Sequence, residues 1–269
     1  MNRNLFRMEL KRNVTSLAIW SLVICALIWL TMMIYPTFLA NQSKITGMLS
    51  IVPKEALQFK GISNINDLLS VLGFYASNNV IFMMLLGSVF SIVLSSGILL
   101  KEEFNKTAEY LLTRPITRLE VFSTKLTVVF IWIVALNLVT SITGWVVMEI
   151  VRTGPYDFSA FIVLSVNTLL LNLLFGSLGL FISVIVRRAK PVTSFCIGLV
   201  LVFYFIYTIS KIAPGYSSLG YISPFRYAGL DLTSLGSGFK TWNLLYFLFV
   251  TILLVTLSWR IYRRKDIYI

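Results

Sequence analysis

Six long runs of apolar residues divide the sequence, and polar or charged positions separate them. The runs lie at 14–35, 80–100, 126–148, 161–186, 192–209 and 242–259. Each is long enough to cross about 30 Å of hydrocarbon as a helix, since an α-helix rises about 1.5 Å per residue. The pattern therefore predicts an all-α polytopic membrane protein with six transmembrane helices, in a single transmembrane domain over residues 1–269.

The composition supports a membrane location. Hydrophobic residues make up 57% of the 269 residues and charged residues 13%, and the mean hydropathy is +0.84. A soluble domain has roughly 45–50% apolar and 25% charged residues, so a soluble enzyme is excluded. The first apolar run exceeds the 7–15 residues typical of a signal-peptide core. We therefore expect it to be a retained transmembrane helix.

The basic residues predict the orientation. The formal net charge is +12, from 23 Lys and Arg against 11 Asp and Glu. With six spans, both termini lie on one side together with the loops 101–125 and 187–190, and 16 of the 23 basic residues fall there. Basic residues are retained in the cytoplasm. We therefore expect both termini to be cytoplasmic, and the charge to report topology rather than nucleic-acid binding.

The segment 1–13 places Arg3, Arg7 and Lys11 four residues apart. This spacing is typical of a short amphipathic helix lying along anionic headgroups. The pattern predicts an N-terminal amphipathic interfacial helix, unless these charges serve topology alone.

Two outer loops are long enough to hold structure of their own. The loop 36–79 contains helix start and stop signals, and we expect it to fold onto the outer leaflet. The loop 210–241 is rich in Gly, Ser, Pro and Tyr. Short re-entrant or interfacial segments are expected there, because irregular backbone at membrane depth needs protein or water to satisfy it.

The cytoplasmic loop 101–125 is the most informative stretch, and we call it the elbow. Four apolar residues form one stripe at i, i+4, i+7 and i+8: Phe104, Ala108, Leu111 and Leu112. Pro115 ends that helix, and Thr117 to Glu120 forms a capping box that starts the next one. Helix, break and helix make a rigid elbow suited to docking a cytosolic partner. The alternative, an elbow lying passively on the headgroups, is disfavoured because anionic lipid repels its glutamates.

At the elbow the sequence resembles ABC transporter permeases of the second type, the membrane subunits of ATP-driven exporters. That family typically carries an acidic pair, then Gly-Thr-x-Glu-x-Leu-Leu, then Pro-x-Ser/Thr-Arg, and a Lys at the start of the third span. Lys125 matches this last position, and Lys106 departs from the pattern because the family usually has Gly there. The six spans and Ser223-Pro224-Phe225 before the last span also look like this family.

The resemblance implies that the elbow is a coupling helix seated in a separate ABC ATP-binding subunit. The residues that would bind this partner are Glu102, Glu103, Thr107, Glu109, Leu111, Leu112, Pro115, Thr117 and Arg118. The sequence has no Gly-x-x-x-x-Gly-Lys-Ser/Thr phosphate loop. ATP and Mg would therefore belong to the partner, with no cofactor in this chain. The resemblance also implies a complex of two ATPase subunits and two permease subunits, the second permease being a copy or a homologue.

The apolar runs themselves contain no Asp, Glu, Lys or Arg. Ion-coupled carriers usually keep an intramembrane carboxylate, so secondary transport is disfavoured. The chain has no His, and both thiols, Cys25 and Cys196, lie inside apolar runs. We therefore expect no metal site, no disulfide and no intrinsic catalytic site.

Three asparagines within the third and fourth runs, Asn137, Asn167 and Asn172, have two interpretations. They form hydrogen bonds between helices, or they line a lightly polar substrate path. A path without fixed charge suits a hydrophobic or amphipathic cargo, such as a peptide, an antibiotic or a lipid-like molecule.

The main hypothesis is an exporter permease that moves such a cargo outward by alternating access. The alternative is a non-transporting immunity or sensor subunit that docks a cytosolic partner through the same elbow. In either case we expect a multi-pass protein of the plasma membrane, and the use of Lys and Ile favours a bacterial source. The sequence does not identify the cargo.

Overall fold

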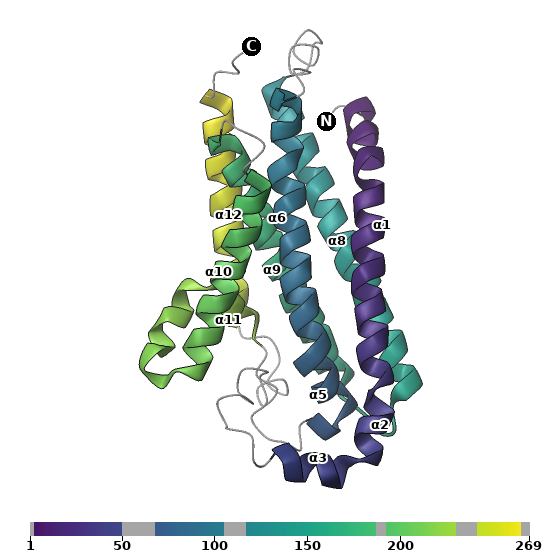
Figure 1. Ribbon diagram of the computed structural model, residues 1–269. Helices are drawn as coiled ribbons and strands as arrows, with labels where there is room; N and C mark the ends of the chain where they lie inside the picture. The colour runs from purple at the N-terminus through teal and green to yellow at the C-terminus, as the bar shows by residue number, and fades with distance from the viewer. Residues whose placement is uncertain (1–2, 50–67, 105–116, 187–191, 230–240, 265–269) are drawn as a thin grey trace.

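The computed structural model describes residues 3–49, 68–104, 117–186, 192–229 and 241–264. Regular structure in these ranges is helical (Figure 1). The elements are α1 Arg3–Met33, α2 Tyr35–Ala40, α3 Gln42–Leu49, α5 Val71–Tyr75, the π-helix η2 Ala76–Val80, α6 Ile81–Phe104, α8 Arg118–Val151, α9 Phe158–Ile185, α10 Val192–Ile212, the 3-10 helix η3 Pro214–Ile222, α11 Pro224–Ala228 and α12 Thr241–Arg264.

Six of these helices or runs of consecutive helices are long and apolar enough to cross a membrane. They comprise α1 with α2, α5 to α6, α8, α9, α10 and α12. This confirms the prediction of an all-α polytopic membrane protein with six spans.

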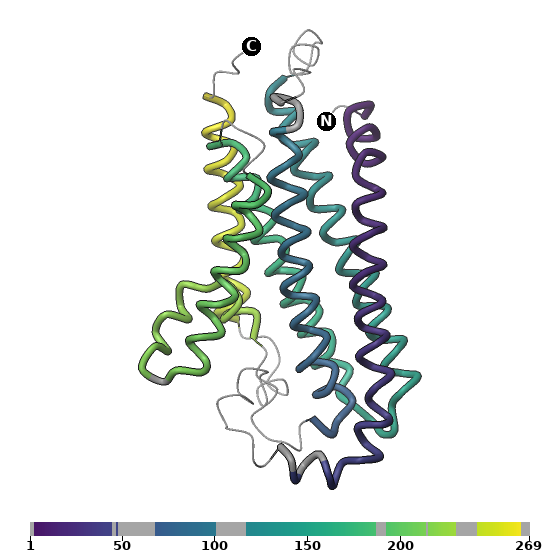
Figure 2. The backbone as a smooth tube through the Cα atoms, viewed as in Figure 1, coloured from purple at the N-terminus to yellow at the C-terminus, as the bar shows by residue number. Residues whose placement is uncertain are grey.

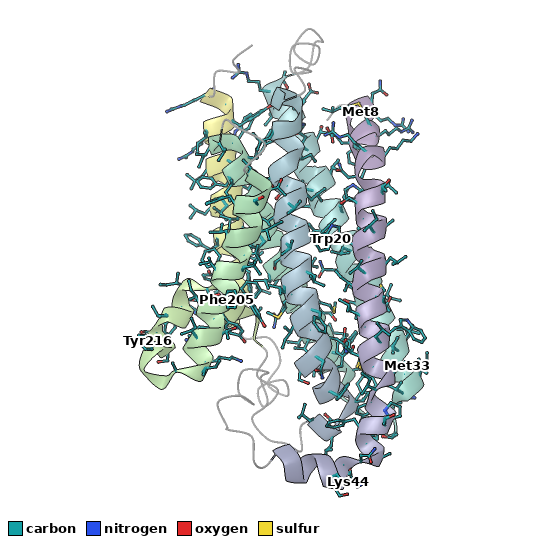
Figure 3. All side chains as sticks on the ribbon, viewed as in Figure 1. Met8, Trp20, Met33, Lys44, Phe205 and Tyr216 are labelled. Atoms are coloured by element: carbon teal, nitrogen blue, oxygen red, sulfur yellow. The ribbon has the colours of Figure 1, made fainter. Side chains whose placement is uncertain are left out.

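The bundle has two ends, which hold different parts of the chain (Figure 2). At one end α1 begins, α6 ends, α8 begins and α12 ends. We call this the elbow end, because the elbow joins α6 to α8 there. At the opposite end lie α2, α3 and the start of α5. Figure 3 shows Met8 near the elbow end and Lys44 at the opposite end.

α6 and α9 form the centre of the bundle and are its most buried spanning helices. They approach closely at Gly179, where an added Cβ would lie 2.6 Å from the carbonyl oxygen of Ile92 and would also meet the Ser95 hydroxyl. A larger side chain there would push the two helices apart.

α1, α10 and α12 lie at the periphery of this single chain and expose many large apolar side chains, among them Leu22, Phe205 and Phe249. Such a surface is tolerated where hydrocarbon or another apolar partner covers it, and it would be a liability in water. The high content of apolar residues is therefore explained in part by the exposed apolar surface of these outer helices.

The N-terminal segment differs from its prediction. Instead of a separate interfacial helix over 1–13, α1 continues without a break from Arg3 to Met33. The reason is local, because this stretch contains neither Gly nor Pro to end the helix. Leu5, Glu9 and Asn13 share one face at a spacing of four residues, and all three are buried. The segment thus packs onto the protein along this face.

The loop predicted to hold short re-entrant or interfacial segments, 210–241, contains two short helices in its described part. η3 folds back along the end of α10, and α11 follows it (Figure 1). Phe225 anchors α11, since its ring is fully buried and lies 5.3 Å from that of Phe175 and 5.6 Å from that of Tyr204. Gly229 follows α11 with a φ of 58°, a conformation that favours glycine. In the other outer loop, 36–79, the expected helix signals include Pro53 and Ser63, which lie outside the described residues.

Candidate functional site

The second half of the elbow begins α8 as the capping box predicted. The hydroxyl of Thr117 accepts a hydrogen bond from the Glu120 amide at 3.3 Å, and the Thr117 amide donates to the Glu120 carboxylate at 3.1 Å. The two bonds satisfy free amides at the helix start. The capping-box prediction is confirmed, and α8 has a defined first residue at Arg118.

Arg118 also connects α8 to the last spanning helix. Its guanidinium donates a hydrogen bond to the backbone carbonyl of Arg263 at 3.3 Å, in the last turn of α12. Further into α8, the ring of Phe122 lies 5.5 Å from that of Trp259 and 5.6 Å from that of Tyr262. The elbow end of α8 is therefore fixed against α12.

The remaining predicted partner-binding residues have no described side chains. Glu102 and Glu103 belong to the last turn of α6, of which only the backbone is described. The others lie outside the described residues: Thr107, Glu109, Leu111, Leu112 and Pro115. Their role stays a prediction.

A buried ionic cluster lies between the helices that flank the elbow. The ammonium of Lys125 on α8 donates a hydrogen bond to the Ile98 carbonyl of α6 at 2.6 Å and lies 3.8 Å from the Glu9 carboxylate of α1. Both charged side chains have no exposed surface. Glu9 is paired in addition with Arg12 at 2.8 Å. The cluster joins three helices through one buried lysine, and we call it the Lys125 cluster (Lys125, Glu9, Arg12 and Ile98).

The energetic character of such a cluster is asymmetric. A buried ion pair contributes little net stability compared with apolar residues of the same size, because desolvation offsets the attraction. Removing one partner, however, typically costs about 3–5 kcal/mol, since it leaves a buried charge uncompensated. The Lys125 cluster therefore constrains the geometry of α1, α6 and α8 more than it stabilises the fold.

Sequence reasoning missed Glu9. Lys125 had been identified as a motif position at the start of the third span, but the N-terminal segment had been interpreted from its basic residues. The available signal was the spacing of Leu5, Glu9 and Asn13, which places the segment's single carboxylate opposite most of its cations. An acid on the face away from Arg3, Arg7 and Lys11 points to a partner elsewhere in the fold.

Two of the three membrane asparagines contact each other. The Asn172 amide donates a hydrogen bond to the side-chain oxygen of Asn137 at 3.1 Å and accepts one from the Ser88 hydroxyl at 3.2 Å. Gly87 makes room, since a Cβ there would lie 2.5 Å from the Asn172 amide nitrogen. Both asparagines are buried. The chain of bonds links α6, α8 and α9.

Asn167 lies one helical turn away on α9 and is half-buried. The structure thus shows interhelical hydrogen bonding for Asn137 and Asn172, while a substrate path at any of the three stays a prediction.

α1 makes two further polar contacts with the core of the bundle. The Thr31 hydroxyl donates to the side-chain oxygen of Asn79 in the π-helix η2. The thiol of Cys25 lies 3.3 Å from the Thr143 hydroxyl of α8. Both cysteines, Cys25 and Cys196, are free thiols. Together with the Lys125 cluster, these contacts fasten α1 along its length.

A second ion pair lies at the opposite end of α8. Glu149 pairs with Arg152 at 3.0 Å and accepts a hydrogen bond from the Tyr156 hydroxyl at 2.8 Å. Burial, followed by the hydrogen bond to the carboxylate, raises the pKa of Tyr156 to about 12. In contrast to the Lys125 cluster, this pair is half-exposed and stays within one helix and the loop that follows.

Within the described parts of the chain, no three His, Cys, Asp or Glu residues are grouped as metal ligands would be. What the charged and polar side chains provide there is a set of contacts between helices.

Comparison with known protein families gives a match over almost the whole chain. A family model described as "ABC-2 family transporter protein" matches residues 3–267. The match includes all six spanning helices and the elbow. No curated protein matches the chain.

Proposed function

The chain belongs to the ABC-2 family of transporter proteins, and we propose that it exports a hydrophobic or amphipathic cargo, using ATP hydrolysed on a separate subunit. Membership makes it a multi-pass membrane protein and the permease subunit of an ABC transporter, a class that works with an ABC ATP-binding subunit. The proposal adds the direction of transport, the class of cargo and the place where the ATPase docks.

The observation that carries the proposal is the construction of the elbow end. The two spanning helices that flank the elbow, α6 and α8, are tied to α1 by the Lys125 cluster, and α8 is also tied to α12 by Arg118 and Phe122. A push on the elbow would therefore reach four spanning helices. ATP and Mg would bind to the partner, and the elbow would carry the movement into the membrane.

The distribution of charge supports a cytoplasmic elbow end. Of the 23 basic residues, 16 belong to the termini and to the loops expected on this side. Lys44 lies at the opposite end (Figure 3). In this orientation the elbow faces the compartment that contains ATP.

The cargo class follows from the spanning helices, whose apolar runs contain no charged residue. A peptide, an antibiotic or a lipid-like molecule suits such surroundings better than a compact ion. One chain of six helices has its centre filled by α6 and α9. We therefore place the pathway between two permease subunits, identical or homologous, driven by two ATPase subunits.

The docking proposal is tested by cross-linking in native membranes. A thiol introduced by Glu109→Cys in the elbow should cross-link through a bifunctional thiol reagent to a cytosolic ATP-binding subunit. The control is Gly154→Cys in the loop after α8, where an added side chain meets nothing within 4 Å. Cross-linking from position 154 and not from position 109 would contradict both the docking and the orientation.

A second variant tests coupling rather than contact. Glu109→Lys reverses a charge of the elbow, and a like-charge contact at an interface costs several kcal/mol. We expect the complex to lose at least about tenfold in ATPase activity or to dissociate, while the chain stays inserted. Full activity with an intact complex would refute the placement of the docking site.

A further inference from the structure

We propose that Glu9 and Lys125 are positioning residues that make α1 move together with the elbow when the ATPase acts. This inference rests on the proposed function and adds a route by which movement reaches the first spanning helix. It assigns a role to the only acidic residue of the N-terminal segment.

The position of Lys125 carries the first step. It lies about two helical turns into α8, which begins at Arg118, and its ammonium reaches the Ile98 carbonyl about two turns before α6 ends at Phe104. Lys125 thus bridges α6 and α8, the two helices that the elbow joins, at a point close to the elbow. At 2.6 Å the contact is short, as expected for a charged donor.

The second step is the attachment of α1. Glu9 is fully buried and faces Lys125 at 3.8 Å, with Arg12 of its own helix at 2.8 Å on the other side. If α8 moved away from α1, the buried ammonium of Lys125 would lose the Glu9 carboxylate as a neighbour, which is costly in a medium of low dielectric constant. Movement of α8 with α1 avoids this cost.

The third step concerns the rest of α1. The helix packs along α8, and their polar contact between Cys25 and Thr143 lies deeper in the bundle. Elsewhere α1 presents mostly exposed apolar side chains, which hold no fixed register against lipid. Of these attachments, the charged contact is the one that lies next to the elbow, where a movement of α8 would begin.

The alternative is a merely structural pair. Apolar residues of similar size would fill the same space without the desolvation cost, so packing alone does not require these charges. A structural role predicts lower stability on substitution, with an unchanged response to ATP. A positioning role predicts a changed response.

The experiment measures the distance between α1 and α8 in the complex with its ATPase, by pulsed electron paramagnetic resonance. Spin labels replace Met8 on α1, which lies near the elbow end, and Leu119 in the first turn of α8, and both side chains are exposed. Cys25→Ala and Cys196→Ala remove the native thiols. Distances are compared without nucleotide and after trapping with ATP and vanadate.

In the labelled chain with Glu9 and Lys125 intact, we expect the distance to stay constant on trapping. With Lys125→Met or Glu9→Gln, it should shift by at least about 2 Å, the scale of helix shifts in switching proteins. Glu9→Gln keeps the shape of the side chain, and vanadate-sensitive ATP hydrolysis by the variant complex shows that it is still folded. Lys125→Arg keeps the charge and should restore the constant distance.

Two results would overturn the inference while leaving the proposed function intact. One is a distance that changes on trapping with Glu9 and Lys125 intact. The other is a constant distance in both Lys125→Met and Glu9→Gln, provided that the complexes hydrolyse ATP in a vanadate-sensitive way. A complex without such hydrolysis would overturn the proposed function, and the inference with it.

Discussion

α8 carries an ion pair near each of its ends, and the two pairs differ in almost every respect. Near the elbow, Lys125 and Glu9 come from different helices, and neither side chain is exposed. At the opposite end, Glu149 lies in the last turn of α8 and Arg152 directly follows the helix, with side-chain exposures of 33% and 49%. The first pair constrains how the helices are arranged. The second is a local contact at the end of one helix, and in the described part of the chain it constrains no other helix.

This difference indicates at which end of α8 a substitution should lower the stability of the protein more. Exposed pairs contribute about 0–1 kcal/mol, whereas breaking a buried pair costs about 3–5 kcal/mol. The elbow end should therefore be the sensitive end of α8. Four substitutions test this ranking, from the largest expected effect to the smallest.

Lys125→Met should lower the free energy of unfolding by about 3–5 kcal/mol, because Glu9 loses one of its two cations inside the protein. Thermal unfolding in detergent measures the loss. The double variant Glu9→Leu with Lys125→Met should recover much of it, since both charges are then gone. If the double variant were as unstable as the sum of the two singles, the pair would not interact.

Asn172→Leu should cost about 0.5–2 kcal/mol, since it removes hydrogen bonds to Asn137 and Ser88 within the bundle. Asn167→Leu is the matched control, because Asn167 is half-buried on the same helix. The ratio of folded to unfolded protein during titration with a denaturing detergent measures both. An equal loss in the two variants would speak against a special role for the buried pair.

Thr117→Ala should cost about 1 kcal/mol through loss of the capping box at the start of α8. Thr256→Ala on α12 is the control, since its hydroxyl bonds back to the carbonyl of Leu253 in its own helix. Melting temperatures of the two variants give the comparison. A control that loses as much as Thr117→Ala would show that the cap adds nothing.

Arg152→Met should change stability by less than about 1 kcal/mol, as expected for a half-exposed pair between residues three apart at a helix end. It repeats the chemical change of Lys125→Met at the other end of α8. The same thermal unfolding assay applies. A loss as large as that of Lys125→Met would erase the proposed distinction between the two ends.

Several features of the fold were predictable because their causes are local. Each spanning helix follows from a single apolar run, and the capping box from Thr117 and Glu120, three residues apart. The unbroken helix α1 could also have been predicted from the sequence, since no Gly or Pro lies between Arg3 and Met33. The spacing of Arg3, Arg7 and Lys11 suggested a separate interfacial helix. That interpretation did not foresee that the opposite face of this segment, with Glu9, is buried against the protein.

The contacts within the site depend on how helices pack, which one sequence does not specify. Glu9 meets Lys125 only because α1 lies against α8 in one register. Asn137 and Asn172 likewise form a pair, while Asn167, just over one turn along the same helix, stays outside it. Their polar character in an apolar run predicted that these asparagines form hydrogen bonds or line a path. The packing of the helices determines which of them bond to each other.

The most direct test of the whole account is to purify the tagged chain from its native membrane in mild detergent, identify what co-purifies and measure ATP hydrolysis. The account predicts a stoichiometric ABC ATP-binding subunit, with vanadate-sensitive hydrolysis that Glu109→Lys abolishes or strongly reduces. A chain that purifies alone, or with a partner that is not an ATPase, would contradict the exporter proposal and favour an immunity or sensor subunit.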